Sequence, residues 1–135
     1  MPEPTPPAEA PADHVFVYGT LRRGQANDIT RLVPAPRFIA PATVSGTLYD
    51  LGAYPGLVLG QGGPVQGEVY AITPALERQL DEIEEIYPQR RDEYRKRRIN
   101  VVLPEGPLEC IVYEINPAYV VGAAAIPGGD WIQRR

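Results

Sequence analysis

The sequence has very few of the side chains that metal sites and nucleophilic sites use. It contains one cysteine, Cys110, so it can form no internal disulfide and no zinc site built from several cysteines. Its one histidine, His14, excludes a site with two histidine ligands, and a Ser-His-Asp triad would have to use it. Any enzymatic chemistry is therefore expected to run mainly on carboxylates, hydroxyls and backbone groups, with no metal or other cofactor.

The sequence also lacks the features of membrane-spanning, secreted and nucleic-acid-binding proteins. No apolar run approaches the roughly 18 residues of a membrane span. Residues 1–13 have neither the basic nor the apolar region of a secretory signal. The 13 basic and 17 acidic residues give a net charge of −4, which disfavours binding to nucleic acid. We therefore expect a cytoplasmic protein whose partner is a small molecule, with neither a nucleic acid nor a membrane as partner.

Length and composition indicate one folded domain behind a short tail. A chain of 135 residues can bury a single core, and a hydrophobic share of 44% is typical of globular proteins. Five of the 16 prolines fall within the first eleven residues, among alanine and glutamate. Such a composition favours an extended, disordered tail over residues 1–12, which leaves the domain at residues 13–135.

Most of the domain has the pattern of short β-strands. Six segments are rich in β-branched and aromatic residues and end at turn residues: His14–Tyr18, Val44–Tyr49, Leu57–Leu59, Val65–Ile72, Tyr94–Leu103 and Leu108–Ile115. We expect the run Gly60–Pro64 to be a turn and residues 104–107 to close a hairpin. With one helix added, the pattern predicts a small α+β domain with about six strands, arranged as a partly closed β-barrel.

One segment has the pattern of an amphipathic helix. Thr73 suits the N-cap, Pro74 suits the first helical position, and Pro88 ends the segment. Between them, apolar residues recur at spacings of 4, 3 and 4: Leu76, Leu80, Ile83 and Tyr87. The spacing predicts that Leu80 and Ile83 lie in the core.

Geometry separates Glu84 from the four other acids of this helix. At about 100° per residue, Glu84 lies about 70° from the centre of the apolar stripe, whereas Asp81 and Glu82 lie about 130° away. Glu85 falls nearly opposite the stripe, and Glu77 lies in the first turn, where the helix dipole explains an acid. Glu84 is therefore expected to be half-buried, which suits a general base near neutral pH. The alternative is that all five acids form an ordinary solvated face.

A second candidate follows the first strand, in the run Tyr18-Gly19-Thr20-Leu21-Arg22. A strand that ends in this way can expose successive backbone N–H groups, which form a small nest for a carboxylate or a developing oxyanion. An ordinary strand-to-loop turn has the same residues, so both interpretations stay open from this run alone.

Two further patterns are weaker. The run Gly60–Gly63 lacks the glycine spacing of a dinucleotide-binding loop and leads into a strand, so it does not predict dinucleotide binding. The basic run Arg90–Arg98 is balanced by seven acids between Glu77 and Glu93, and it indicates a solvated strand.

Several segments match, in order and spacing, those of one known family. They are Val15–Gln25 with Asn27, Gly46–Gly52, Tyr54–Leu57, Val65–Tyr70, Leu80–Glu84, Tyr94–Arg95, Ile111–Tyr113 and Gly129–Trp131. Together they make the chain resemble the gamma-glutamylcyclotransferase-like family, and in particular small bacterial members similar to gamma-glutamylamine cyclotransferases. The resemblance covers nearly all of the chain after the tail.

The resemblance implies a fold and a set of site residues. The fold is a compact mixed β-barrel with flanking helices. The family's substrate-binding loop, Tyr-Gly-Ser/Thr-Leu, matches Tyr18, Gly19, Thr20 and Leu21, and its catalytic glutamate, the last residue of a Leu-Asp-x-x-Glu motif, matches Glu84.

Two further positions are candidate pocket residues, and two others differ from the family's usual residues. Tyr54 and Tyr94 lie in matching segments and are candidate pocket residues. Many members have glycine at the position of Glu85 and arginine at the position of Lys96.

The implied reaction suits a chain with so few reactive side chains. Members of the family release 5-oxoproline from γ-glutamyl compounds, and the substrate's own α-amine attacks its γ-carbonyl group. Ring closure is intramolecular, and one carboxylate, Glu84, can accept and return the proton without a metal ion. The alternative is a non-catalytic small-ligand-binding module on the same fold. The leaving amine and the oligomeric state stay open.

Overall fold

The computed structural model describes residues 11–84 and 92–133. These residues form six strands: β1 (Asp13–Val17), β2 (Arg37–Asp50), β3 (Pro55–Ile72), β4 (Tyr94–Leu103), β5 (Gly106–Ile115) and β6 (Ala124–Ala125). One α-helix, α1 (Pro74–Ile83), and three 3₁₀ turns accompany them: η1 (Ile29–Arg31), η2 (Pro117–Val120) and η3 (Pro127–Gly129). The predicted α+β class is confirmed, although the described part of the chain has one α-helix where flanking helices are expected.

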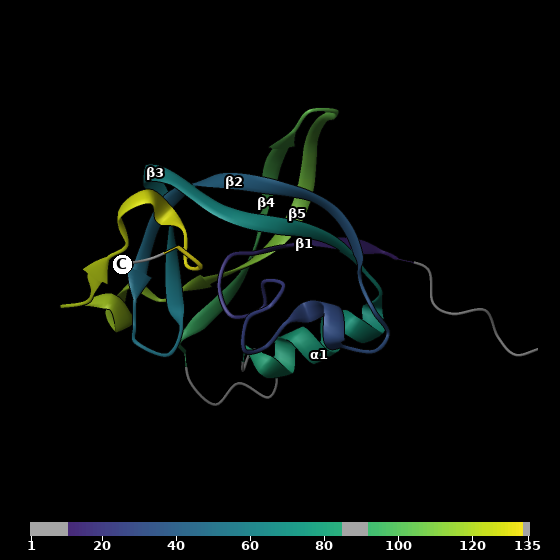
Figure 1. Ribbon diagram of the computed structural model, residues 1–135, viewed down its shortest axis with the longest axis horizontal. Helices are drawn as coiled ribbons and strands as arrows, with labels where there is room; N and C mark the ends of the chain where they lie inside the picture. The colour runs from purple at the N-terminus through teal and green to yellow at the C-terminus, as the bar shows by residue number, and fades with distance from the viewer. Residues whose placement is uncertain (1–10, 85–91, 134–135) are drawn as a thin grey trace, which may run out of the picture.

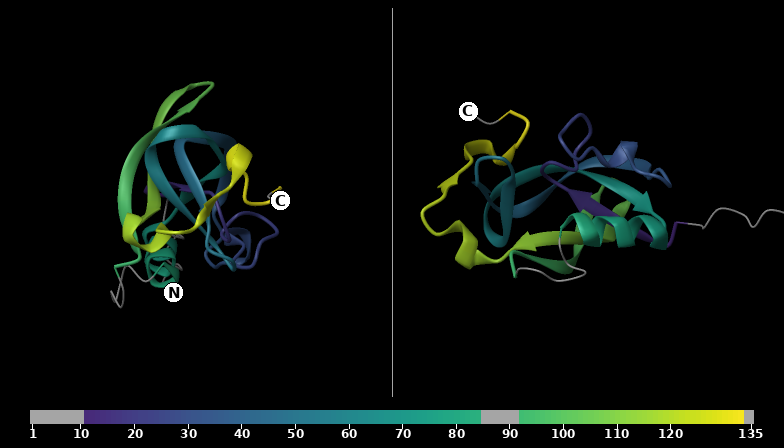
Figure 2. Two further views of the ribbon diagram at one scale, coloured as in Figure 1. Left: turned by 90° about the vertical axis from the view of Figure 1, so that its left-hand side faces the viewer. Right: turned by 90° about the horizontal axis from the view of Figure 1, so that it is seen from below.

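The six strands form a single sheet with the order β4-β5-β1-β3-β2-β6. β1 pairs in parallel with β5, and every other neighbouring pair is antiparallel. Seen end-on, the sheet curls into a half-open barrel (Figure 2, left), and α1 lies against one side of it (Figure 1). This is the partly closed barrel that the strand pattern predicts.

The curled sheet buries apolar side chains on both faces, and this double burial fixes β1. Phe16 packs into one cluster, together with Trp131 from the C-terminal segment. Its neighbours Val15 and Val17 point to the opposite face, where Leu80 of α1 covers them. A slip of one residue would exchange the two faces, so the register of β1 is tightly specified. The point at which the chain leaves β1 and enters the loop at residue 18 is fixed with it.

The predicted turn at Gly60–Pro64 is wrong, because β3 continues through it as one 18-residue strand. Ser45 of β2 pairs with Pro64, and the next residue, Gly46, pairs with Leu59. Residues 60–63 are therefore extra residues that bulge out of the ladder, with φ values of +119° at Gly60 and +145° at Gly62. Turn-like composition here marks a bulge inside a continuous strand.

β2 begins at Arg37, seven residues before the predicted start at Val44. Residues 37–43 include Pro41 and have a weak β pattern. They pair with β3 only, because β6 reaches β2 only at Tyr49 and Asp50. A proline without an N–H donor is tolerated along such an open edge.

The helix begins as predicted and differs at its end. The Thr73 hydroxyl accepts a hydrogen bond of 3.1 Å from the N–H of Leu76, and Pro74 occupies the first helical position. Leu76 and Leu80 are fully buried. Ile83 is 38% exposed, so its predicted place in the core is wrong: it is the last helical residue and borders an open cavity.

Some predictions fall on residues outside those described. They are the tail over residues 1–10, the helical positions Glu85, Tyr87 and Pro88, and the basic residues Arg90 and Arg91. At the tail boundary, the N–H of Ala12 donates a 3.0 Å hydrogen bond to the carbonyl of Ile72, so this residue, which composition assigns to the tail, is bonded to the end of β3. No helix in the described ranges has the length and apolar character needed to cross a membrane.

Candidate active site

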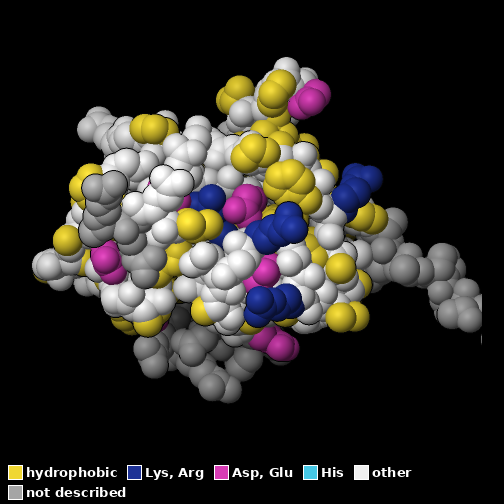
Figure 3. Space-filling view, viewed as in Figure 1, with side chains coloured by type: hydrophobic (Ala, Val, Ile, Leu, Met, Phe, Trp, Pro, Cys, Tyr) yellow, Lys and Arg dark blue, Asp and Glu magenta, His cyan; other side chains and the backbone are white. Residues whose placement is uncertain are grey.

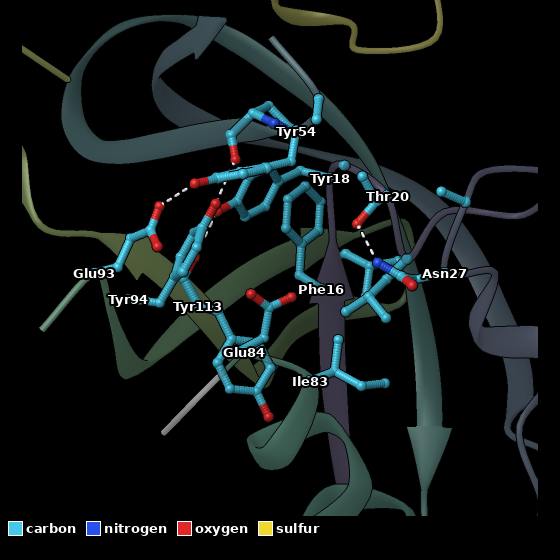
Figure 4. Close-up of a pocket in the computed structure, with 16 residues that line it drawn as sticks. Phe16, Tyr18, Thr20, Asn27, Tyr54, Ile83, Glu84, Glu93, Tyr94 and Tyr113 are labelled. Carbon is cyan, nitrogen blue, oxygen red and sulfur yellow. Dashed lines mark hydrogen bonds between the residues drawn. The ribbon is translucent and has the colours of Figure 1, made fainter. Parts of the chain in front are cut away.

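A cavity of about 420 Å³ lies where the loop after β1 meets the C-terminal end of α1. Five aromatic side chains line it: Phe16, Tyr18, Tyr54, Tyr94 and Tyr113. The loop residues Gly19, Thr20 and Leu21 contribute to one wall, and two carboxylates, Glu84 and Glu93, also border it. All of the site residues expected from the sequence therefore lie around one space (Figure 4).

Glu84 is held at the edge of this cavity by the end of the helix. It is the C-cap of α1, and its backbone N–H donates a 2.9 Å hydrogen bond to the carbonyl of Leu80. Its side chain is half-buried, as expected from its angle to the apolar stripe, and the carboxylate points into the cavity (Figure 4). A carboxylate in this position can exchange protons with a molecule bound in the cavity.

The loop after β1 lines the cavity and packs closely against the start of β3. A Cβ atom on Gly19 would lie 2.5 Å from Cγ of Pro55, so only glycine fits between the loop and the start of β3. The carbonyls of Gly19, Thr20 and Leu21 accept hydrogen bonds of 3.0, 2.8 and 2.9 Å from backbone N–H groups farther along the chain. Within the described residues, the N–H groups of these three residues donate none in return. Such N–H groups are suited to bind an anion.

The tyrosine hydroxyls of the cavity wall are committed to the protein. Tyr18 donates a 2.6 Å hydrogen bond to the carbonyl of Tyr113, and Tyr94 donates one of 2.7 Å to the carbonyl of Pro55. Burial, followed by the negative charge of Glu84, raises the pKa of Tyr18 well above its usual value. Burial also raises the pKa of Tyr94, with smaller contributions from Tyr18 and Glu84. These phenols therefore stay protonated at neutral pH and form a neutral wall.

Glu93 is a second carboxylate that borders the cavity, and no pattern in the sequence predicts it there. It is only 8% exposed and accepts a hydrogen bond from the hydroxyl of Tyr54. The ring of Tyr54 lies 6.3 Å from that of Tyr94, which places both candidate pocket residues side by side. Nothing in the sequence distinguishes Glu93 from the acids around it, because its burial depends on β4 and on the loop of Tyr54.

Asp81, which the helix geometry places about 130° from the centre of the apolar stripe, nevertheless contacts the sheet. Its carboxylate accepts a 2.8 Å hydrogen bond from the hydroxyl of Tyr113 and a 3.1 Å bond from Nζ of Lys96. Helical geometry alone misses this contact, because the β4–β5 hairpin packs along the flank of α1 next to the apolar stripe. Glu82, at a similar angle, is exposed as expected. Nζ of Lys96 forms ion pairs with Asp81 and Glu77, so this residue links β4 to α1.

The basic run is engaged in ion pairs along β4. Arg95 pairs with Asp92 at 3.0 Å, Arg97 with Glu114 at 3.2 Å, and Arg98 with Asp13 at 2.7 Å. On the face shown in Figure 3, Lys and Arg side chains likewise lie among Asp and Glu. These pairs support the interpretation of a solvated, charge-balanced strand.

Comparison with known proteins now places the chain in a family. The model described as "Gamma-glutamyl cyclotransferase, AIG2-like" matches residues 15–133. The chain belongs to this family, which confirms the resemblance drawn from its sequence.

Individual relatives agree with this placement. The gamma-glutamylcyclotransferase family protein YtfP of Escherichia coli is 36% identical over 121 residues, which cover 89% of this chain and 96% of the relative. Its NMR structure has a TM-score of 0.61 at 33% identity over the same shares of the two chains. The gamma-glutamylaminecyclotransferase of Bos taurus is 36% identical over 113 residues, 73% of this chain and 63% of the relative.

A solved mammalian structure shares the fold. The crystal structure of an AIG2-like protein from Mus musculus has a TM-score of 0.67 at 28% identity, covering 80% of this chain and 82% of the other. The family model and the relatives' names confirm the predicted enzyme type, a gamma-glutamylcyclotransferase.

Proposed function

We propose that this protein releases 5-oxoproline from a small γ-glutamyl amine or γ-glutamyl amino acid, with Glu84 as general acid and base. One observation carries the proposal: the Glu84 carboxylate and the loop residues Gly19–Leu21, whose N–H groups donate no hydrogen bond within the described residues, border the same cavity. The name of the bovine relative, gamma-glutamylaminecyclotransferase, supports an amine as the leaving group.

The proposed reaction needs no nucleophile from the protein. Glu84 takes a proton from the α-ammonium group of the substrate, and the freed amine attacks the γ-carbonyl carbon. The new C–N bond closes a five-membered ring and leaves an oxyanion on the former carbonyl oxygen. Glu84 then returns the proton to the nitrogen of the leaving amine as the γ-amide bond breaks, and the positively charged ring nitrogen releases its second proton to solvent to become the lactam N–H. The products are 5-oxoproline and a free amine, so no water is consumed and one carboxylate serves both proton transfers.

The loop has the complementary task of holding the substrate. Backbone N–H groups at Gly19, Thr20 and Leu21 can bind the α-carboxylate or stabilise the oxyanion, because they are fixed dipoles that need little reorganisation. A γ-glutamyl chain held curled between the loop and Glu84 reacts within one molecule, which supplies much of the rate.

The aromatic wall supports these steps by excluding water. Tyr18, Tyr94 and Tyr113 keep their protons and direct them to the protein. They therefore lower the polarity around the reacting groups without competing with Glu84 for a proton. A less polar site strengthens the interaction of the N–H groups with an anion.

The proposal is tested by incubating the purified protein with a panel of γ-glutamyl donors and measuring 5-oxoproline. The panel contains γ-glutamyl amino acids, γ-glutamyl-ε-lysine and γ-glutamyl alkylamines. We expect saturable release from at least one donor class, unaffected by a metal chelator. Saturable binding without release from any donor would instead favour the ligand-binding module. The cytoplasmic location stays a prediction of the sequence.

A further inference from the structure

A charged network lies directly behind the substrate loop. Arg22 follows Leu21, and its guanidinium group bonds two carboxylates, with Nε 2.9 Å from Glu68 of β3 and Nη1 2.9 Å from Asp130 near the C-terminus. The Arg22 side chain is only 12% exposed. An arginine shared by two carboxylates at hydrogen-bonding distance is held in a single orientation.

Glu68 ties this part of the loop to the sheet. Besides Nε of Arg22, it accepts hydrogen bonds from the backbone N–H of Arg23 at 3.0 Å and from the hydroxyl of Tyr70 at 2.9 Å. Burial and then the contact with Glu68 raise the pKa of Tyr70 above its usual value, so this phenol remains a donor. Two consecutive loop residues are therefore anchored to one carboxylate of β3.

Asp130 is itself fixed independently of Arg22. Its Oδ1 atom also accepts a 3.0 Å hydrogen bond from the N–H of Ile132, and its neighbour Trp131 is buried in the core. The C-terminal segment thus offers a rigid carboxylate to the loop, although it lies far away in the sequence.

The network acts at the turn that carries the unpaired N–H groups. The backbone N–H of Arg22 donates a 3.0 Å hydrogen bond to the carbonyl of Gly19, which closes the turn over residues 19–22. Arg22, Glu68 and Asp130 do not border the cavity, so they do not contact a bound substrate directly. A binding geometry made of backbone dipoles depends on such supporting contacts, because a small displacement weakens every hydrogen bond at once.

We propose that Arg22, Glu68 and Asp130 are positioning residues that hold the N–H groups of Gly19–Leu21 in place for the substrate carboxylate. The C-terminal segment thereby contributes to substrate affinity. This inference rests on the proposed function, in which the loop binds the γ-glutamyl group.

The test compares Asp130→Asn, Glu68→Gln and Arg22→Lys with the wild type. Arg22→Lys keeps the charge but cannot hold both carboxylates with one planar group. We expect KM to rise by about tenfold in each variant and the affinity for 5-oxoproline to fall by a similar factor, while kcat changes by less than about threefold. Glu109→Gln is the matched control, because Glu109 is 64% exposed and pairs with Arg98 on the surface. It should leave all three constants unchanged.

Two readouts separate the outcomes. 5-oxoproline binding is measured by calorimetry, which needs no turnover, and folding is checked by the thermal midpoint Tm. A folded Asp130→Asn variant with unchanged KM and unchanged 5-oxoproline affinity would overturn the inference, even if Tm falls. If the wild type binds 5-oxoproline but turns over no donor, the proposed function is contradicted. The inference about the loop then holds if the variants bind 5-oxoproline more weakly than the wild type, and it is overturned if they bind it equally well. A wild type that neither binds nor turns over contradicts both proposals.

Discussion

Individual residues contribute to this site through the room that they leave and the direction in which they point, more than through unusual chemical reactivity. Gly19 leaves room for Pro55, and Glu84 is turned toward the cavity by the helix end.

Cys110, the one thiol, is buried, and burial raises its pKa to about 11, so it stays protonated at neutral pH. It packs as a small core residue.

The closeness of Gly19 to Pro55 gives a prediction for a single methyl group. Gly19→Ala places a Cβ atom 2.5 Å from Cγ of Pro55, and the carbonyl of Pro55 is in turn bonded to Tyr94. The loop must therefore move away from β3. We expect KM to rise by at least about tenfold and Tm to fall by several degrees. Steady-state kinetics and thermal unfolding measure the two effects.

Gly63→Ala is the matched control for this change. No atom lies within 4 Å of a Cβ built there, and the residue is exposed in the bulge of β3. Both KM and Tm should match the wild type. A Gly19→Ala variant that behaves like Gly63→Ala would mean that the loop and β3 are farther apart than described.

At the scale of elements, α1 is held by two kinds of contact. Leu76 and Leu80 bury its apolar stripe, whereas Asp81 bonds to Tyr113 and Lys96 on its flank. Leu80 and Asp81 lie in the last turn of α1, so these contacts fix the direction from which Glu84 enters the cavity. The apolar contact follows from residue spacing, but the polar one depends on β4 and β5, which come later in the chain.

The structure predicts an order of stability losses along this helix. Leu80→Ala should lower the free energy of unfolding by about 2–5 kcal/mol, because it leaves a cavity in the core. Ile83→Ala should cost less than half as much, since Ile83 is 38% exposed, and Glu82→Ala should stay within about 0.5 kcal/mol. Urea unfolding measures all three. Equal losses for Leu80 and Ile83 would support the register that the apolar spacing alone suggests.

At the scale of the whole molecule, the sequence predicts those parts of the fold whose pattern is local. The β4–β5 hairpin follows from its β-rich runs and turn residues, and the start of α1 follows from capping. The continuity of β3 does not, because its glycine-rich bulge has the composition of a turn and only pairing with β2 makes it a strand. The site divides in the same way. Glu84 and the loop have local signals, whereas Glu93 and Asp81 owe their places to tertiary contacts.

The boundary of the folded molecule gives a further prediction. Composition favours a disordered tail, and among the described residues Ala12 is the first to donate a backbone hydrogen bond to the sheet. Removal of residues 1–10 should therefore change Tm by less than about 2 °C and leave kcat unchanged, as scanning calorimetry and the 5-oxoproline assay can measure. A loss of many degrees would indicate that the tail packs on the domain.

The central claim is that the Glu84 carboxylate performs both proton transfers, and turnover by Glu84→Gln tests it most directly. The substitution keeps the shape of the side chain and removes the base. Glu82→Gln is the control, because Glu82 is exposed, whereas Asp81 bonds to Tyr113 and Lys96. With folding verified by circular dichroism, we predict that 5-oxoproline release by Glu84→Gln falls by about 10²–10⁴-fold, while binding of the donor is largely kept and Glu82→Gln retains wild-type turnover. Full turnover by a folded Glu84→Gln variant would contradict the account.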